Sequence, residues 1–337
     1  MKRLLLHLGL PKTATTTLQH HLFQRLHDEG KINFLGKVVA YDDNGKSYFK
    51  NYQGALIRKA CEEKITRPVS QELDELLLDD RLNVFSDEGI MISYPNQDNL
   101  PLTKKIENLK QILSQFDVTV VLTIRQPVDY LYSLYVQLYG QYYQANRQLD
   151  SFEKFSGQLL STDDYNEQES VFMHKNIELL ARFFETKVLV FEDIKHQPDY
   201  FCGQLAELLG VKPELVCEAI LGNHENIKKR AGDGVYSQRV TSLSGIKKSL
   251  ANRTRQFRKL HNLLQSIYRA RFMPFERIFQ MKLTERDYFH ARPSPQLRHE
   301  LLKKIGIPAS FTAESYALSI EKMQRYGYIA PESSHGK

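Results

Sequence analysis

The sequence predicts an α/β protein, in which a parallel β-sheet carries helices on both faces and a mainly helical C-terminal part follows. Two observations predict this fold class. Short apolar runs rich in Leu, Val and Ile, without clean alternation, fit strands that are buried on both faces. Segments with helical periodicity lie between these runs, and such alternation is typical of a parallel sheet. The four runs are residues 3–10, 82–85, 118–124 and 187–191.

The helical segments are marked by apolar side chains at three- or four-residue spacing, which places them on one face of a helix. Ligands of parallel sheets bind outside the carboxyl ends of the strands. The residues that follow each predicted strand are therefore the first candidates for a site. The marking residues are Leu18, Leu22 and Leu26, then Leu131, Tyr135 and Tyr139, and then Ile177, Leu180, Ala181 and Phe184.

Length and composition restrict the class of protein. The 337 residues are 42% hydrophobic and 26% charged, which excludes disordered, collagen-like and disulfide-stapled chains. We expect an α/β core over residues 1–235 and a helical, basic extension over 236–330 packed on it, or a single domain overall. A net charge of +6 is too small to indicate a nucleic-acid binder.

The sequence also predicts where the protein resides. Its first apolar run is too short for a signal peptide, and nowhere do 18 apolar residues follow one another, so we expect a cytoplasmic protein. Cys61, Cys202 and Cys217 lie far apart and form no CxxC pair. They fit buried thiols in a reducing compartment better than a disulfide framework or a zinc site.

The positive charge is concentrated in one segment. Residues 237–275 contain nine basic side chains and no acidic one, and without these nine the net charge is 6 − 9 = −3. Two interpretations stay open for this segment. It forms a solvated helical face, or it binds an anionic polysaccharide or the head groups of a membrane surface.

The turn after the first predicted strand has the features of an anion site. Residues 9–18 read Gly-Leu-Pro-Lys-Thr-Ala-Thr-Thr-Thr-Leu, so that hydroxyl side chains and Lys12 meet at the start of a helix. Free N–H groups and the helix dipole favour an anion there. The alternative is an ordinary helix cap with spare threonines. The turn is not a Walker A loop, because no second glycine precedes a lysine at the helix start.

A second anion site is predicted after the strand at 118–124. Arg125 follows this strand directly, and Pro127 suits the first position of a helix. Ser133 lies six residues further, about 9 Å along the helix axis. The planar fork of an arginine binds phosphate through two parallel hydrogen bonds. The alternative is an arginine paired with a carboxylate and a serine without a role.

Asp87 and Glu88 follow the strand at 82–85 and are candidates for a general base, Glu88 first and Asp87 second. Both could instead cap the following segment or pair with basic side chains. Histidine is the rival base. We expect His7 to be a satisfied core residue, and His20 and His21 to face solvent or packing.

These motifs resemble those of the sulfotransferases that use 3′-phosphoadenosine 5′-phosphosulfate (PAPS) as sulfuryl donor. Residues 11–18 resemble their 5′-phosphosulfate loop, and Arg-x-Pro with a serine eight residues after the arginine resembles their 3′-phosphate motif. The resemblance covers about Leu4 to Val211. Ala14 stands where the family usually has glycine, a change that we expect to be tolerated only with a negative φ.

The resemblance implies the P-loop-NTPase-like sulfotransferase fold, PAPS as donor and no metal. It places Glu88 as catalytic base and Lys12 on the leaving oxygen. It also implies a basic loop over the donor, to which Lys228, Lys229 and Arg230 correspond loosely. The donor-binding residues that it implies are Lys12, Thr13, Ala14, Thr15, Thr16, Thr17, Arg125 and Ser133.

The acceptor is expected to be a hydroxyl of a carbohydrate or an envelope glycan. Two other functions stay open. Glu192 and Asp193, after the strand at 187–191, could hold the metal of a P-loop kinase. The basic segment could make the chain a non-catalytic polyanion-binding protein. Six tyrosines between 130 and 143 indicate core packing, with base or sugar stacking as the alternative.

Overall fold

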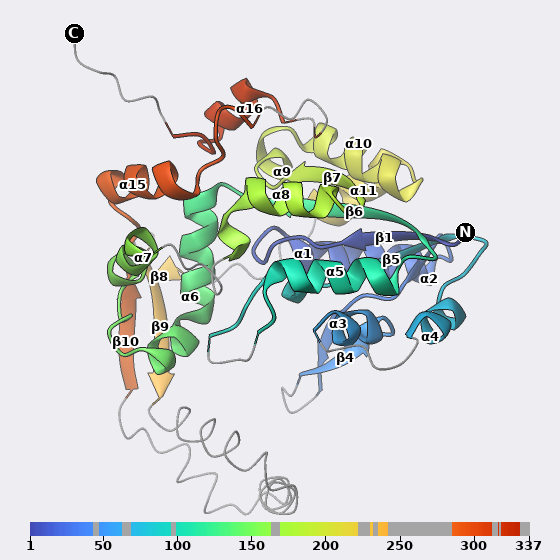
Figure 1. Cartoon of the computed structure of the whole chain (residues 1–337), viewed down its shortest axis with the longest axis horizontal. Helices are drawn as coiled ribbons and strands as arrows, with labels where there is room; N and C mark the ends of the chain where they lie inside the picture. The colour runs from blue at the N-terminus through green and yellow to red at the C-terminus, as the bar shows by residue number, and fades with distance from the viewer. Residues whose placement is uncertain are drawn as a thin grey trace, which may run out of the picture.

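The fold is built on a five-stranded parallel sheet in the order β2-β5-β1-β6-β7 (Figure 1). A computed structural model describes residues 1–42, 47–62, 69–95, 99–162, 169–221, 230–231, 235–241, 285–311, 316 and 318–330. The strands of the sheet are β1 (Arg3–His7), β2 (Ile32–Phe34), β5 (Leu82–Ser86), β6 (Asp117–Ile124) and β7 (Glu185–Val190).

The predicted fold class is confirmed, and four of these strands coincide with the four apolar runs. β2 is not predicted from the sequence, because three residues with an asparagine in the middle form no recognisable apolar run. The register brings the strand ends to one edge of the sheet. His7 pairs with Ser86 on one side and Val121 on the other, and Ile124 pairs with Val190. The segments that follow these strands therefore emerge together.

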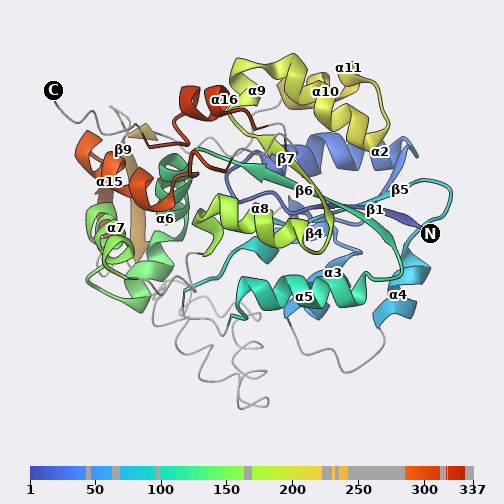
Figure 2. The ribbon, with the colours of Figure 1, turned by 45° about the horizontal axis from the view of Figure 1, so that its top comes forward.

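Helices cover both faces of the sheet (Figure 2). Neighbouring residues of β1 point into different cores, Leu5 into one and Leu4 and Leu6 into the other, which explains the continuous apolar run. One face carries η1 (Leu18–Phe23), α2 (Gln24–Asp28), α10 (Pro198–Leu209) and α11 (Pro213–Leu221). The other carries α3 (Ala55–Glu62), α5 (Leu102–Ile112), α6 (Pro127–Ala145) and α8 (Met173–Ala181).

The tyrosines of α6 pack in the core, which confirms the interpretation preferred from the sequence. Tyr130, Tyr135, Tyr139 and Tyr142 are each at most 1% exposed. Their rings contact one another and those of α7 (Phe152–Ser161), for example Tyr142 against Phe155 with centroids 4.7 Å apart. Such clusters stabilise a core through both area and ring geometry.

Short elements connect this framework. The described part of the chain also contains α1 (Thr15–Thr17), a π-helical turn in η1, the hairpin of β3 (Val38–Tyr41) and β4 (Ser47–Asn51), α4 (Val69–Leu76), η2 (Glu88–Met91), η3 (Glu169–Val171) and α9 (Asp193–His196).

The described residues of the C-terminal part include strands as well as helices. β8 (Arg230–Ala231), β9 (Val235–Thr241) and β10 (Glu285–His290) form an antiparallel sheet. α15 (Pro295–Ile305) packs on α6 and α7, and α16 (Ile320–Arg325) follows. The basic segment 237–275 lies outside the described residues from position 242 onward. Among the described residues, no helix has the length and apolarity needed to cross a bilayer.

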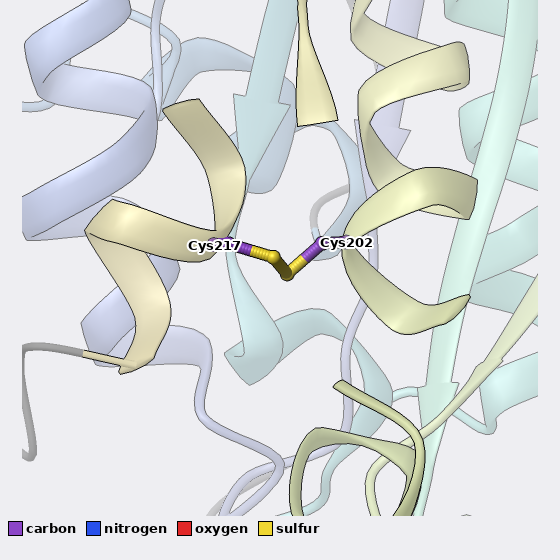
Figure 3. Close-up of a disulfide and its surroundings, with 2 residues drawn as sticks. All are labelled: Cys202 and Cys217. Carbon is purple, nitrogen blue, oxygen red and sulfur yellow. A yellow bond between two sulfur atoms is a disulfide. The ribbon is translucent and has the colours of Figure 1, made fainter. Parts of the chain in front are cut away.

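The cysteine prediction is wrong for two of the three residues. Cys202 of α10 and Cys217 of α11 form a disulfide, with Cα atoms 5.4 Å apart (Figure 3). Only Cys61 is a free, buried thiol, and burial raises its pKa to about 12. The spacing of 15 residues contains no disulfide signal, because only the packing of α11 against α10 brings the two side chains together. The cysteines therefore do not indicate a reducing compartment.

Candidate functional site

The turn between β1 and α1 has an unusual backbone. Lys12 and Ala14 both have positive φ, 68° and 63°, so the expectation of a negative φ at Ala14 is wrong. Side chains with a Cβ rarely adopt this left-handed conformation, and such residues cluster at functional sites. Ala14 keeps this conformation and still starts the helix, since Leu18 N donates to Ala14 O at 3.0 Å.

The threonines of the turn divide into two groups. The hydroxyls of Thr13 and Thr15 both donate to the Leu10 carbonyl, at 2.5 and 3.3 Å, so they hold the turn together. Thr17 is buried, whereas Thr16 is half-buried and makes no side-chain hydrogen bond within the described residues. Thr16 is thus the hydroxyl of this turn that can donate to an anion.

Arg125 lies against the same turn. Its Nη1 donates to the Lys12 carbonyl at 3.0 Å, although 113 residues separate the two. Its guanidinium also stacks 4.9 Å from the centre of the Phe191 ring. Burial and the nearby charge of Arg125 lower the pKa of Lys12, and Glu88 opposes this effect. Both predicted anion-binding elements therefore belong to one site.

Ser133 lies on α6, whose first residue is Pro127 as predicted. Gln126 caps this helix, because its side chain accepts a hydrogen bond from Asp129 N at 2.7 Å. Ser133 is half-buried and makes no side-chain hydrogen bond within the described residues. The structure gives it no contact with Arg125, so their joint action on one anion remains a prediction.

Glu88 lies at the edge of this site, where a lysine and a glutamine hold its two carboxylate oxygens. Lys37 Nζ is 2.8 Å from Glu88 Oε1, and Gln19 Nε2 donates to Oε2 at 3.2 Å. The side chain of Glu88 is 22% exposed, so it is open to a substrate. A carboxylate held by two donors and partly open to solvent can still accept a proton from a hydroxyl.

Asp87 is the poorer candidate for the base. It is fully buried and accepts hydrogen bonds from Tyr52 Oη at 2.5 Å and Gly89 N at 2.9 Å, and it pairs with Lys37 and Arg58 at 3.2 Å. Burial by itself raises the pKa of Asp87, but the two cations and the hydrogen bonds lower it overall. A carboxylate so fully engaged organises its surroundings and has no oxygen for a substrate.

The histidines occupy the places expected of them. His7 is buried below the turn, with Nδ1 2.8 Å from Ser86 Oγ and Nε2 3.3 Å from Thr123 Oγ1. Burial lowers the pKa of His7 to about 4. A Cβ at Gly9 would lie 2.8 Å from His7 Nε2, so glycine is needed where the turn passes over this ring. His20 accepts a hydrogen bond from Val39 N at 3.3 Å, which is a packing role.

Glu192 and Asp193 are engaged by the C-terminal segment, which disfavours a metal-binding role. Glu192 accepts hydrogen bonds from Gln126 N at 2.9 Å and Tyr328 Oη at 2.6 Å. Asp193 is buried and pairs with Lys322 and Tyr326. The described residues contain no group of acidic, His and Cys side chains that could hold a metal ion.

The partners of Asp87 and Glu88 are not predicted from the sequence. Lys37 follows β2, so recognition of that strand would have drawn attention to it. Gln19, Tyr52 and Arg58 lie in or beside helices and carry no sequence signal. Of the basic loop predicted over the donor, Lys228 and Lys229 lie outside the described residues, and Arg230 is described only as part of the backbone of β8.

No family model and no curated protein sequence matches the chain. Two similar solved structures are sulfotransferases. One, from Alicyclobacillus acidocaldarius, is 12% identical over 64% of this chain and 83% of its own, with a TM-score of 0.39. The other, a sulfotransferase domain from the curacin biosynthetic pathway, is 14% identical over 64% of this chain and 77% of its own, with a TM-score of 0.29.

A third similar structure belongs to the PezAT toxin–antitoxin system of Streptococcus pneumoniae. It is 11% identical over 67% of this chain and 81% of its own, with a TM-score of 0.26. One fold hosts many activities, and at these scores a likeness carries no conclusion about function. The function of this chain is therefore inferred from its own residues.

Proposed function

We propose that this protein is a sulfotransferase that moves a sulfuryl group from PAPS to the hydroxyl of an acceptor. One observation carries the proposal most strongly. The Arg125 guanidinium binds the backbone carbonyl of Lys12, so the two elements that we propose to bind anions lie together, within reach of the charge of Glu88. A donor that is anionic at two positions requires such a pair, and an acceptor hydroxyl requires a base.

The residues present fit this donor. Lys12 and the Thr16 hydroxyl would bind the 5′ end, with the backbone of Thr13–Thr17 around it. Arg125 and Ser133 would bind the 3′-phosphate. The donor supplies the sulfuryl group and a phosphate leaving group. Transfer of this kind passes through a loose transition state, as in phosphoryl transfer, so that positioning and charge neutralisation dominate. Lys12 would neutralise charge on the leaving oxygen, and Glu88 would take the acceptor proton.

The partners of the protein are also proposals, and they are inferred from the same residues. We propose a carbohydrate or envelope glycan as the acceptor, with an anionic polysaccharide as one form of it. We propose a protein that needs no metal and binds no nucleic acid, and that resides in the cytoplasm, where a disulfide such as Cys202–Cys217 is unusual. Segment 237–275 would supply contact with a polyanion or a membrane surface.

Two alternatives predict different ligands. A P-loop kinase would bind Mg-ATP, but Glu192 and Asp193, the acids available for its metal, are paired with C-terminal side chains. A polyanion-binding protein would use segment 237–275 and would not need Lys12.

Calorimetric titration separates these functions. We expect 3′-phosphoadenosine 5′-phosphate (PAP) to bind in the presence of EDTA, and ATP to bind more weakly with or without magnesium. Arg125→Gln should weaken the binding of PAP at least tenfold, because the two parallel hydrogen bonds of the guanidinium to the 3′-phosphate are lost. Arg182→Gln is the matched control, since Arg182 is an exposed residue at the end of α8. Tighter binding of Mg-ATP than of PAP would overturn the proposal in favour of a kinase.

A further inference from the structure

The half-buried carboxylate of Glu192 lies near Arg125 and yet does not pair with it. Glu192 follows β7, directly after Phe191, whose ring stacks on the guanidinium. Glu192 and Arg125 form no ion pair among the described residues. Their charges nevertheless interact: burial raises the pKa of Glu192, while Tyr328, Gln126 and, to a smaller degree, Arg125 act in the opposite direction.

Neutral donors occupy both oxygens of Glu192. Oε1 accepts from the backbone N–H of Gln126, the residue after Arg125, at 2.9 Å. Oε2 accepts from the hydroxyl of Tyr328 at 2.6 Å, across 136 residues of sequence. These partners replace water that the half-buried carboxylate has lost, since an unsatisfied oxygen is costly away from water. The Arg125 guanidinium therefore keeps its hydrogen bond to the Lys12 carbonyl and its stacking on the Phe191 ring.

Tyr328 is held in place firmly enough to serve this purpose. Its side chain is fully buried, and its carbonyl accepts from Ile307 N at 2.9 Å. The carbonyl of the preceding residue, Gly327, accepts from Gln126 Nε2 at 2.7 Å. Two consecutive residues of the C-terminal segment therefore contact Gln126 and Glu192, the residues that follow Arg125 and Phe191.

We propose that Tyr328 is a positioning residue for the donor site: its hydroxyl occupies Glu192, so that Glu192 does not capture the Arg125 guanidinium and the guanidinium stays available to an anionic ligand. This inference rests on the proposed function, since the ligand meant is the 3′-phosphate of the donor. Without the hydroxyl, Oε2 of Glu192 would lose its donor, and the Arg125 guanidinium, whose charge already acts on Glu192, would take its place. An arginine that is paired with a carboxylate no longer offers both of its parallel N–H donors to a phosphate.

The test measures the ratio of two affinities. PAP and 5′-AMP differ only in the 3′-phosphate, so the ratio of their dissociation constants measures how well Arg125 binds that phosphate. A general loss of stability affects both ligands alike and leaves the ratio unchanged. We expect Tyr328→Phe to reduce the preference for PAP about tenfold and to leave 5′-AMP unchanged, by calorimetry well below the melting temperature. Tyr326→Phe is the matched control, because Tyr326 binds Asp193 instead of Glu192. It should leave the ratio unchanged.

A double variant separates positioning from structure. In Glu192→Gln/Tyr328→Phe no charge remains to capture Arg125, so the preference for PAP should return to that of the unaltered protein. If Tyr328→Phe keeps the full preference, or if the double variant does not restore it, the role of Tyr328 is refuted. If the unaltered protein itself binds PAP no better than 5′-AMP, the proposed function fails, and that result is distinct from either outcome for the variants.

Discussion

At the scale of single residues, the turn at Lys12 and Ala14 concentrates strain and charge. Both residues have left-handed backbones, which cost roughly 1–2 kcal/mol each for a residue with a Cβ. The hydrogen bonds of Thr13 and Thr15 to Leu10, and that of Arg125 to Lys12, hold the turn in this conformation. The surrounding structure thus maintains a backbone that these side chains do not favour.

Ala14→Gly should stabilise the protein by about 1 kcal/mol, because glycine adopts positive φ without a steric cost. Urea denaturation measures the change in the free energy of unfolding. Ala60→Gly, within α3, is the matched control and should destabilise, since glycine in a helix is unfavourable. A loss of stability in Ala14→Gly would contradict the strain described at this turn.

Glu88→Gln should leave the affinity for PAP unchanged and lower turnover at least 100-fold, because an amide cannot take the proton from the hydroxyl of the acceptor. Steady-state kinetics and calorimetry together measure both effects. Asp87→Asn is the contrasting variant. It should lower the free energy of unfolding, since Asp87 is buried among Lys37, Arg58 and Tyr52. Normal turnover in Glu88→Gln would assign the base elsewhere.

His7 should make stability depend on pH. Burial lowers its pKa to about 4 from 6.5, so between these values the unfolded chain binds a proton that the folded chain does not. Stability is therefore lost as pH falls through this window, by about 3 kcal/mol at most. Denaturation at pH 6.5 and pH 4.5 should show a smaller loss for His7→Gln than for the unaltered protein. Equal losses would mean that His7 titrates normally.

At the scale of elements, the disulfide ties α10 to α11 on the face of the sheet that also carries η1 and α2. α11 contacts η1, and Arg25 of α2 pairs with Glu218 of α11 at 2.9 Å. The helix that begins at the candidate donor turn therefore packs against a covalently linked pair. This link is an element-level feature, because it connects neighbouring helices and closes a short loop.

Reduction should lower the free energy of unfolding by about 3 kcal/mol, the value expected for closing a loop of 15 residues. Denaturation with and without a phosphine reductant measures the effect. Cys202→Ala/Cys217→Ala is the control and should not respond to the reductant. Alkylation of the unfolded, unreduced protein should modify Cys61 alone, and modification of all three cysteines would contradict the disulfide.

At the scale of the whole molecule, the C-terminal segment is bound to the core through three carboxylates, of which Asp193 is fully buried. Lys322 donates a hydrogen bond to Asp193, and Tyr328 donates one to Glu192. Arg298 donates one to Asp129. Asp129 and Glu192 lie within a few residues of Arg125 or of Phe191. The last described residues of the chain are therefore part of the architecture that surrounds the candidate site.

Lys322→Met should destabilise the protein by about 3 kcal/mol or more, since it leaves the fully buried Asp193 without its cation. Lys322→Met/Asp193→Asn removes the charge as well and should recover part of the loss. Urea denaturation measures both. Equal stability of Lys322→Met and the unaltered protein would mean that the C-terminal segment does not depend on this pair.

The sequence alone predicts four of the five strands and the candidate residues that follow them. Apolar runs that are buried on both faces leave a strong local signal, and β1, β5, β6 and β7 coincide with such runs. Lys12, Glu88 and Arg125 are candidates because they follow those strands, and parallel strands end at one edge. The alternating burial of Leu4, Leu5 and Leu6 shows the physical basis of that signal.

Only the tertiary structure decided which side chains meet. The left-handed backbone of Ala14, the disulfide, the engagement of Asp87 by Lys37 and Arg58, and the bond of Tyr328 to Glu192 all depend on contacts between distant segments. Periodicity records whether a position is buried, because burial acts on each residue separately. It does not record a partner, because a hydrogen bond or a covalent bond depends on two positions that the fold alone brings together.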